Sequence, residues 1–323
     1  MATKHEQNYV FASARVHALE NGLLARDKFE RLLDAPDETG IRKMLSEFGY
    51  GKGSETLPTE EFLEAELLRA YTDVSDMLPG NPVFRAMRIP YDNQNLKLAI
   101  KCERRTEFSY PELATPLSVL PPEQIEKAVS ARDFSVFPEK MAEAAPAAIE
   151  AYDKTGDPQQ IDLILDAACF ADMKAAADKS GSEEFVRYLA IRADSVNLLS
   201  AARILAMGRG AAFMADAFVP GGTLPLSFFS VLDDGETAFA EAAAKTAYGT
   251  AFSSGEMSFS ALSGKLDAVM WSLLDRIRMS AFGAGAAIGY LAQKEKEIRN
   301  LRVILAAKQA GESPRKTRER LTV

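Results

Sequence analysis

Three asparagines recur at nearly equal intervals in this sequence, so the same polar side chain could serve the same purpose at three equivalent positions. Each is followed by leucine and has an acidic residue three positions earlier; the three copies are Asp92–Asn95, Asp194–Asn197 and Glu297–Asn300. An amide side chain both donates and accepts, so it can bond the backbone of a neighbouring helix or help to bind a ligand. Repeat proteins mostly reuse a position for packing, so the spacing favours a structural role for all three asparagines.

Residues suited to catalysis are few. The chain has two histidines, His5 and His17, and no cysteine stands near enough in sequence to complete a metal site with them. A Ser-His-Asp or Cys-His arrangement would have to use one of these two, and no Gly-x-Ser-x-Gly turn is present. We therefore expect no catalytic, cofactor-binding or metal-binding residue, and a protein that is not an enzyme.

Two glycine-rich segments resemble nucleotide-binding loops only superficially. Residues 48–54 lack the Gly-x-x-x-x-Gly-Lys-Ser/Thr order and join two expected helices where a strand should lead in, so we predict a turn. Residues 283–289 have one residue more than the dinucleotide fingerprint and no preceding strand. Small residues in such a helical context favour the close approach of two helices.

The sequence pattern predicts helices almost throughout the chain. Residues 9–33 form one long amphipathic stretch, and Thr59 is predicted to cap a helix that runs to Met77. Ser182 and Ser313 are predicted to begin further helices. No period-two alternation flanked by hairpin turns is present, so the sequence predicts an all-α fold.

The repeat extends beyond the asparagines. After each one, apolar or small residues follow at positions of a single helix face, and another acidic, apolar helix lies about 35 residues before it. These earlier helices are residues 62–71, 161–170 and 266–277. The sequence therefore predicts three tandem homologous helical domains of about 100 residues, which we place at residues 1–113, 114–217 and 218–323.

Charge and hydropathy exclude several partners. The 323 residues include 46 acidic and 38 basic side chains, a balance of −8 that argues against nucleic acid. The best candidate for a membrane span, residues 281–292, is shorter than the roughly 20 residues of a membrane-spanning helix, so we predict no transmembrane segment. Residues 294–320 carry nine bases and four acids, which indicates either a solvated helix or a basic patch for an acidic protein or anionic lipid.

Three segments resemble a known family. Residues 9–20, 288–305 and 313–321 are similar to the C-subunit family of V-type/A-type ATP synthases, the prokaryotic relatives of the d-type proteins of vacuolar ATPases. The resemblance implies three similar helical domains arranged as a pseudo-threefold funnel. Its narrow side would sit on the cytoplasmic face of the membrane rotor ring, and its opening would receive the central shaft. The chain departs from the family pattern at His17 and Ala307, where a basic residue and a glycine are more usual.

The function implied by this resemblance is that of a non-catalytic rotor adaptor. It would couple the central-stalk subunits to the membrane proteolipid ring, transmit torque for ion or proton transport, and lie peripherally on the cytoplasmic side of the membrane. We expect Arg15, Arg299 and Arg302 to contact these partners, because guanidinium groups suit carboxylates. The alternative is a soluble helical-repeat scaffold for unrelated cytosolic partners.

Overall fold

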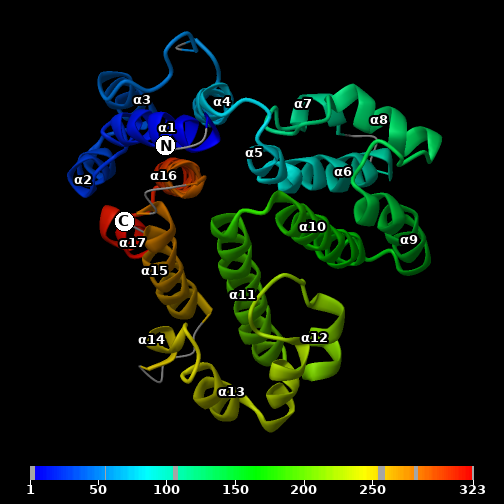
Figure 1. Ribbon diagram of the computed structural model, residues 1–323. Coiled ribbons are helices and arrows are strands. Elements are labelled where there is room, and N and C mark those ends of the chain that lie inside the picture. The colour runs from blue at the N-terminus through cyan, green and yellow to red at the C-terminus, as the bar shows by residue number, and fades with distance from the viewer. Residues whose placement is uncertain (1–3, 55, 105–107, 254–258, 280–282, 322–323) are drawn as a thin grey trace. The chain divides into compact units, whose positions relative to one another are not determined.

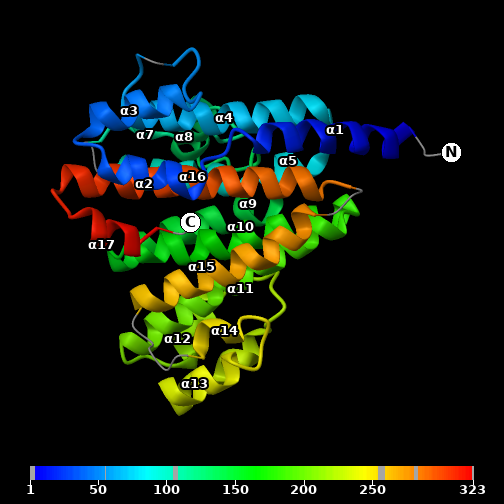
Figure 2. The same cartoon turned by 90° about the vertical axis from the view of Figure 1, so that its left-hand side faces the viewer.

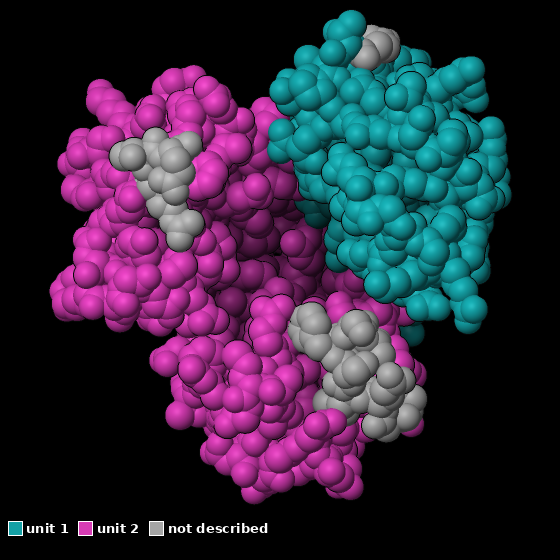
Figure 3. Space-filling model, turned by 180° about the vertical axis from the view of Figure 1, so that it is seen from behind, with its two compact units in different colours: residues 1–81, 271–323 teal, residues 82–270 magenta. Residues whose placement is uncertain are grey.

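The computed structural model describes residues 4–54, 56–104, 108–253, 259–279 and 283–321, and the prediction of an all-α fold is confirmed, since these residues contain helices and no strand. The chain forms two compact units, which Figure 3 distinguishes by colour. Unit 1 consists of residues 1–81 and 271–323, so it contains both ends of the chain. Unit 2 consists of residues 82–270.

Unit 1 is built around the long helix α16, Gly285–Gln309 (Figure 2). It packs against α1, α3 and α4, and its apolar side is fully buried. The other helices of this unit follow in chain order, with only the second part of α15 belonging to it: α1 (Lys4–Glu20), α2 (Arg26–Asp34), α3 (Glu38–Glu47), α4 (Thr59–Met77), α15 (Phe259–Arg278) and α17 (Pro314–Glu319).

Unit 2 contains the remaining helices (Figure 1), and its most extensive helix packing is that of α9 against α10. Helix α10 also packs against α6 and α11, so it links the first and second halves of the unit. In chain order the helices are α5 (Pro82–Ala86), α6 (Ile89–Arg104), α7 (Tyr110–Leu113), α8 (Pro122–Ala131), α9 (Glu139–Thr155), α10 (Gln159–Ser180), α11 (Glu183–Ala206), α12 (Ala211–Ala217), the 3₁₀-helix η1 (Leu226–Asp234), α13 (Glu236–Ala243) and α14 (Gly249–Phe252).

Local chemistry accounts for several helix ends. Ser182 accepts from the N–H of Phe185 at 3.2 Å and Ser313 from that of Lys316 at 3.4 Å, so both predicted caps are confirmed. The predicted cap at Thr59 is wrong by one position, because Pro58 is the N-cap and the Thr59 hydroxyl donates to a side chain of α3 instead.

The prediction of one continuous helix over residues 9–33 is wrong. Helix α1 ends at Glu20 and α2 begins at Arg26, and the Asn-Gly pair at 21–22 lies in the turn between them. Val10, on α1, is 51% exposed. The turn brings Leu24 against α16, so a tertiary contact overrides the local helical pattern.

The two glycine-rich segments behave as predicted. Gly49, Gly51 and Gly53 all have positive φ within a turn, and a Cβ at Gly51 would lie 1.8 Å from the ring of Phe62 on α4. At Gly289, a Cβ would lie 2.6 Å from the Arg278 Cβ, so glycine permits α16 to approach the end of α15 closely.

Candidate functional site

The first acid-x-x-Asn motif lies on α6 and holds a connecting segment against that helix. The Asn95 amide is fully buried, its Nδ2 donates to the carbonyl of Thr115 at 3.0 Å, and its Oδ1 accepts the Thr115 N–H at 3.0 Å. Nδ2 also donates to the Ser118 Oγ at 3.0 Å. One amide thus satisfies both backbone groups of a residue that lies 20 positions later in the chain.

The acid of the first motif holds the same segment, residues 115–120. Asp92 is buried, and its Oδ1 accepts the N–H groups of Val119 at 2.7 Å and Leu120 at 3.0 Å. Burial raises the pKa of Asp92, while these hydrogen bonds and the nearby guanidinium of Arg88 act in the opposite direction. Arg88 in turn donates to the carbonyls of Leu117 and Ser118 at 2.7 and 2.8 Å. Backbone N–H groups and backbone carbonyls of this segment therefore both have side-chain partners on or near α6.

The second motif, on α11, repeats this arrangement. The Asn197 Nδ2 donates to the carbonyl of Val219 at 2.8 Å, and its Oδ1 accepts the Val219 N–H at 2.9 Å. Asp194 accepts the N–H groups of Thr223 and Leu224, both at 3.0 Å. Both motif side chains are fully buried, so each would leave unsatisfied backbone groups behind if it were removed.

Two neighbours complete the second motif. The Tyr248 hydroxyl donates to the Asp194 Oδ2 at 3.2 Å, and burial together with this carboxylate raises the pKa of Tyr248. A Cβ at Gly222 would lie 2.1 Å from the Asp194 Oδ1, so the held segment needs a glycine at this point.

The third motif, on α16, holds a segment from the opposite end of the chain. The Glu297 Oε2 accepts the N–H of Leu24 at 2.6 Å, and Leu24 lies in the turn between α1 and α2. Asn300 is also buried, on the next turn of the helix. The first two motifs hold segments that follow them in sequence, whereas the third holds one that precedes it by 273 residues.

A buried cluster of charges surrounds Glu297. The Lys294 Nζ lies 2.9 Å from the Glu297 Oε1 and 3.0 Å from the Glu66 Oε1, and all three residues are at most 4% exposed. Glu66 also accepts from Arg69 at 2.6 Å and from the Gly51 N–H at 3.3 Å. Burial raises the pKa of Glu297 to about 8 and lowers that of Lys294.

Sequence reasoning did not identify Glu66 or Lys294. Lys294 stands three residues before Glu297, so helical spacing alone could have suggested that pair. The partnership with Glu66 joins two distant helices, α4 and α16, and no local pattern indicates it. For the asparagines, sequence reasoning expected a bond to the backbone of a neighbouring helix; Asn95 and Asn197 bond connecting segments instead.

The three arginines expected to contact partners are exposed and belong to unit 1. Arg15 lies on α1 with its guanidinium 5.9 Å from the centre of the Phe11 ring, and Arg299 lies on α16. The Arg302 Nε donates to the Glu60 Oε1 at 2.8 Å, so this side chain is tied to α4. Their contact with other proteins stays a prediction.

Comparison with known proteins decides the family. A model of the family described as "ATP synthase (C/AC39) subunit" matches residues 12–320 of this chain. The chain belongs to this family. The C subunit of the A-type ATP synthase of Thermococcus onnurineus (strain NA1) is 25% identical over 333 residues, which cover 96% of this chain and 89% of the relative. The resemblance drawn from residues 9–20, 288–305 and 313–321 is thereby confirmed.

In this ATP synthase (C/AC39) family member, much of the basic C-terminal segment is neutralised within unit 1. The Arg318 guanidinium lies 2.6 Å from the Glu30 carboxylate, which ties α17 to α2, and these interactions lower the pKa of Glu30. Glu312 pairs with Lys316 at 3.0 Å and with Arg320 at 2.8 Å. These charges therefore have structural partners in the chain itself.

The described part of this family member contains no group of three or more His, Cys, Asp or Glu side chains placed to hold a metal ion. His17 is exposed and lies 2.8 Å from Glu20, while the side chain of His5 lies outside the described residues. Among the described helices, none is long and apolar enough to cross a membrane.

Proposed function

We propose that this chain is a non-catalytic central-rotor adaptor of a V/A-type ATPase or ATP synthase. In this role it couples the central-stalk subunits to the membrane proteolipid ring and transmits torque for ion transport. The observation that carries the proposal is the match of residues 12–320 to the ATP synthase (C/AC39) subunit family. The name of the T. onnurineus relative, which is the C subunit of an A-type ATP synthase, supports it.

The internal bonding suits a part that must resist deformation. Connecting segments are ordinarily the softest parts of a helical protein, yet the first two motifs fix two of them to helices through buried hydrogen bonds. Between α6 and α10, Lys97 lies 2.7 Å from Asp166 and Lys101 lies 2.7 Å from Asp162. Close packing and such cross-links let a body transmit strain rather than absorb it.

The proposal includes three repeats of the kind expected at residues 1–113, 114–217 and 218–323, each with one motif helix: α6, α11 and α16. The bond from Leu24 to Glu297 favours a modified division. The segment that completes the third motif comes from the start of the chain, so residues after α1 belong with the third repeat rather than opening the first. Unit 1 likewise combines residues from the start of the chain, 1–81, with residues from its end, 271–323.

The proposed location is peripheral, on the cytoplasmic face of the membrane within the ATPase complex. The proposed contact residues are Arg15, Arg299 and Arg302, which are exposed and whose guanidinium groups match carboxylates on a partner protein. Arg302 would exchange Glu60 for such a carboxylate, at little cost because exposed ion pairs contribute roughly 0–1 kcal/mol.

A tagged pull-down from native membranes in mild detergent, read by mass spectrometry, tests this function. We expect the stalk, catalytic-head and proteolipid-ring subunits to be recovered together with this chain. Recovery of only soluble proteins, from cells shown to contain such an ATPase, would contradict the adaptor function and favour the helical-repeat scaffold.

A further inference from the structure

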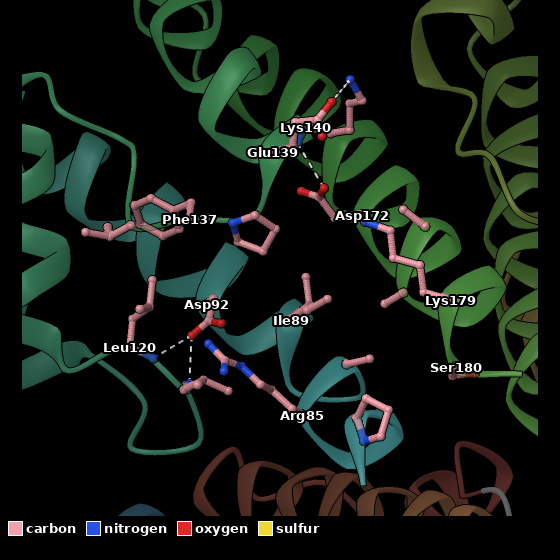
Figure 4. Close-up of a pocket in the computed structure, with 17 residues that line it drawn as sticks. Arg85, Ile89, Asp92, Leu120, Phe137, Glu139, Lys140, Asp172, Lys179 and Ser180 are labelled. Atoms are coloured by element: carbon pink, nitrogen blue, oxygen red, sulfur yellow. Dashed lines mark hydrogen bonds and ion pairs between the residues drawn. The ribbon is translucent and has the colours of Figure 1, made fainter. Parts of the chain in front are cut away.

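A cavity of about 490 Å³ lies within unit 2 (Figure 4); Asp92 of the first motif is among its lining residues, and the three motif asparagines are not. Helices α5, α6 and α10 contribute to its wall, together with the segments that lead into α8 and α9. This volume falls within the range of small-molecule sites, roughly 300–1,000 Å³. Apolar side chains make up much of the lining, among them Ile89, Leu120, Val136, Phe137 and Pro138.

Three carboxylates line the cavity: Glu139, which pairs with Lys140, and the two aspartates Asp92 and Asp172, which are already bonded to backbone donors. Asp92 accepts the two N–H groups of the segment before α8, as described above. Asp172 accepts the N–H of Lys140 at 2.9 Å and that of Met141 at 2.8 Å, at the start of α9. Both aspartates therefore act as caps for the surrounding backbone, which explains why they are buried.

Two of the cations that line the cavity, Arg85 and Lys179, have no close carboxylate partner in the described part of the chain. Arg85 comes from α5 and Lys179 from α10, and Figure 4 shows the Arg85 side chain extending toward Asp92 and the Lys179 side chain toward Asp172. Within the described ranges, neither cation makes a hydrogen bond or a close ion pair with an acidic side chain, although Arg85 acts on Asp92 and Lys179 on Glu139 through longer-range attraction, which acts to lower the pKa of each carboxyl group. By contrast, the Lys140 ammonium, which also lines the cavity, lies 2.8 Å from Glu139 and 2.9 Å from a second glutamate.

We propose that this cavity binds a small organic anion, with a phosphate or carboxylate head held by Arg85 and Lys179 and a short apolar tail packed against Ile89, Leu120 and Phe137. A guanidinium and an ammonium on different walls give an anion charge-assisted hydrogen bonds from two directions. The apolar lining accounts for the tail. The site is independent of the rotor function proposed above.

The opposite choice, a cationic ligand between the two aspartates, fits the cavity less well. The aspartate oxygens already accept backbone N–H groups, and an amine would meet the positive ends of Arg85 and Lys179. Burial also raises the pKa of Asp92, so this group takes up a proton more readily than an exposed aspartate and opposes an anion less.

Isothermal titration calorimetry on the full chain, with three probes of matched tail length, tests the site. Hexyl phosphate should bind with one-to-one stoichiometry, whereas hexanol and hexylamine should not bind measurably. Arg85→Gln and Lys179→Gln should each weaken hexyl phosphate at least about tenfold, as expected for the loss of a hydrogen bond to a charged group. Lys127→Gln, an exposed change on α8 outside the cavity lining, is the matched control and should leave the affinity unchanged.

Equal binding of the three probes, preferential binding of hexylamine, or an affinity indifferent to both cavity substitutions would overturn the proposal. Arg85 and Lys179 are both exposed, so circular dichroism of the two variants should show an intact helical fold. Vesicles of phosphatidylcholine with and without phosphatidic acid then distinguish two sources of the anion. Flotation that requires phosphatidic acid and is lost in Arg85→Gln supports a lipid head group, whereas hexyl phosphate binding without flotation supports a free anion.

Discussion

Replacing Lys294 by methionine should destabilise unit 1 in a pH-dependent way. Lys294 is 3% exposed, and its ammonium lies within 3.0 Å of two buried carboxylates, Glu66 and Glu297. Methionine fills a similar volume, so the dominant effect is the loss of charge. Removing one partner of a buried ion pair costs about 3–5 kcal/mol, because the remaining charge is left in a poorly solvated position.

The two carboxylates are not equally affected. Glu66 keeps Arg69 at 2.6 Å and the Gly51 N–H, whereas Glu297 keeps the Leu24 N–H at 2.6 Å. In the variant, Glu297 is therefore left without the Lys294 ammonium beside it, and it must either take up a proton or remain charged in a buried position. Its pKa is already about 8, and loss of the cation raises it further.

The sign of the pH dependence follows from this pKa. A folded-state pKa above the ordinary value of 4.5 means that the native protein binds the Glu297 proton more tightly than the unfolded chain. The stability this provides is complete below about pH 4.5 and is lost as the pH rises through 8. In Lys294→Met the decline continues above pH 8, by up to about 1.4 kcal/mol per pH unit.

The single tryptophan provides the measurement. Trp271 belongs to unit 1, and its ring lies 4.9 Å from the Lys296 Nζ, so its fluorescence reports unfolding of this unit. Urea unfolding at pH 6 and pH 9 should show a loss of a few kcal/mol that is larger at pH 9. Lys43→Met, the same change at an exposed position of α3, should cost less than about 0.5 kcal/mol. Equal losses at both pH values, or a loss no larger than that of the control, would refute the argument.

Three further experiments test the motifs, the glycine turn at residues 48–54 and the proposed partner surface. Asn197→Ala should lower the free energy of unfolding by about 2 kcal/mol or more in thermal melts, because it strands two buried backbone groups. Gly51→Ala should cost more than Gly53→Ala: both have positive φ, costing about 1–2 kcal/mol, but Gly51 alone would place its Cβ against an aromatic ring. The double change Arg299→Glu and Arg302→Glu should weaken co-purification with the ATPase while preserving the helical circular dichroism signal.

Matched controls separate these effects from general damage. Val196→Ala removes an exposed side chain next to Asn197, so a melting temperature as low as that of Asn197→Ala would contradict the role given to the amide. Arg187→Glu reverses an exposed charge on α11 outside the predicted contact set. If it reduced co-purification as much as the double change, the partner surface would not be localised to α16.

Local patterns predicted what local interactions determine. The helical class, the caps at Ser182 and Ser313, the turn at residues 48–54 and the close approach near Gly289 depend on a few neighbouring residues, and the structure confirms each. The failures involve distant partners. The helix expected over residues 9–33 is interrupted where Leu24 meets Glu297, a contact spanning 273 residues.

For the motifs as well, the sequence predicted the local pattern but not the distant partners. Spacing identified the three asparagines and their acids, but the partners of Asn95 and Asn197 lie 20 and 22 residues away in segments without regular structure. Periodicity describes a helix face and says nothing of which loop covers it. Arg302 is a comparable case, since its partner Glu60 is 242 residues distant.

The acid of the motif is aspartate in the first two copies and glutamate in the third. Aspartate occurs where the held segment follows the motif closely, by 27 or 28 residues for Asp92 and by 29 or 30 for Asp194. Glutamate occurs in the third motif, where one carboxylate bonds both a turn from the other end of the chain and Lys294 on its own helix. The longer side chain allows both contacts at 2.6 and 2.9 Å, and a Glu297→Asp variant would have to give up one of them. The third motif therefore closes unit 1 by joining the two ends of the chain, which the first two motifs do not need to do.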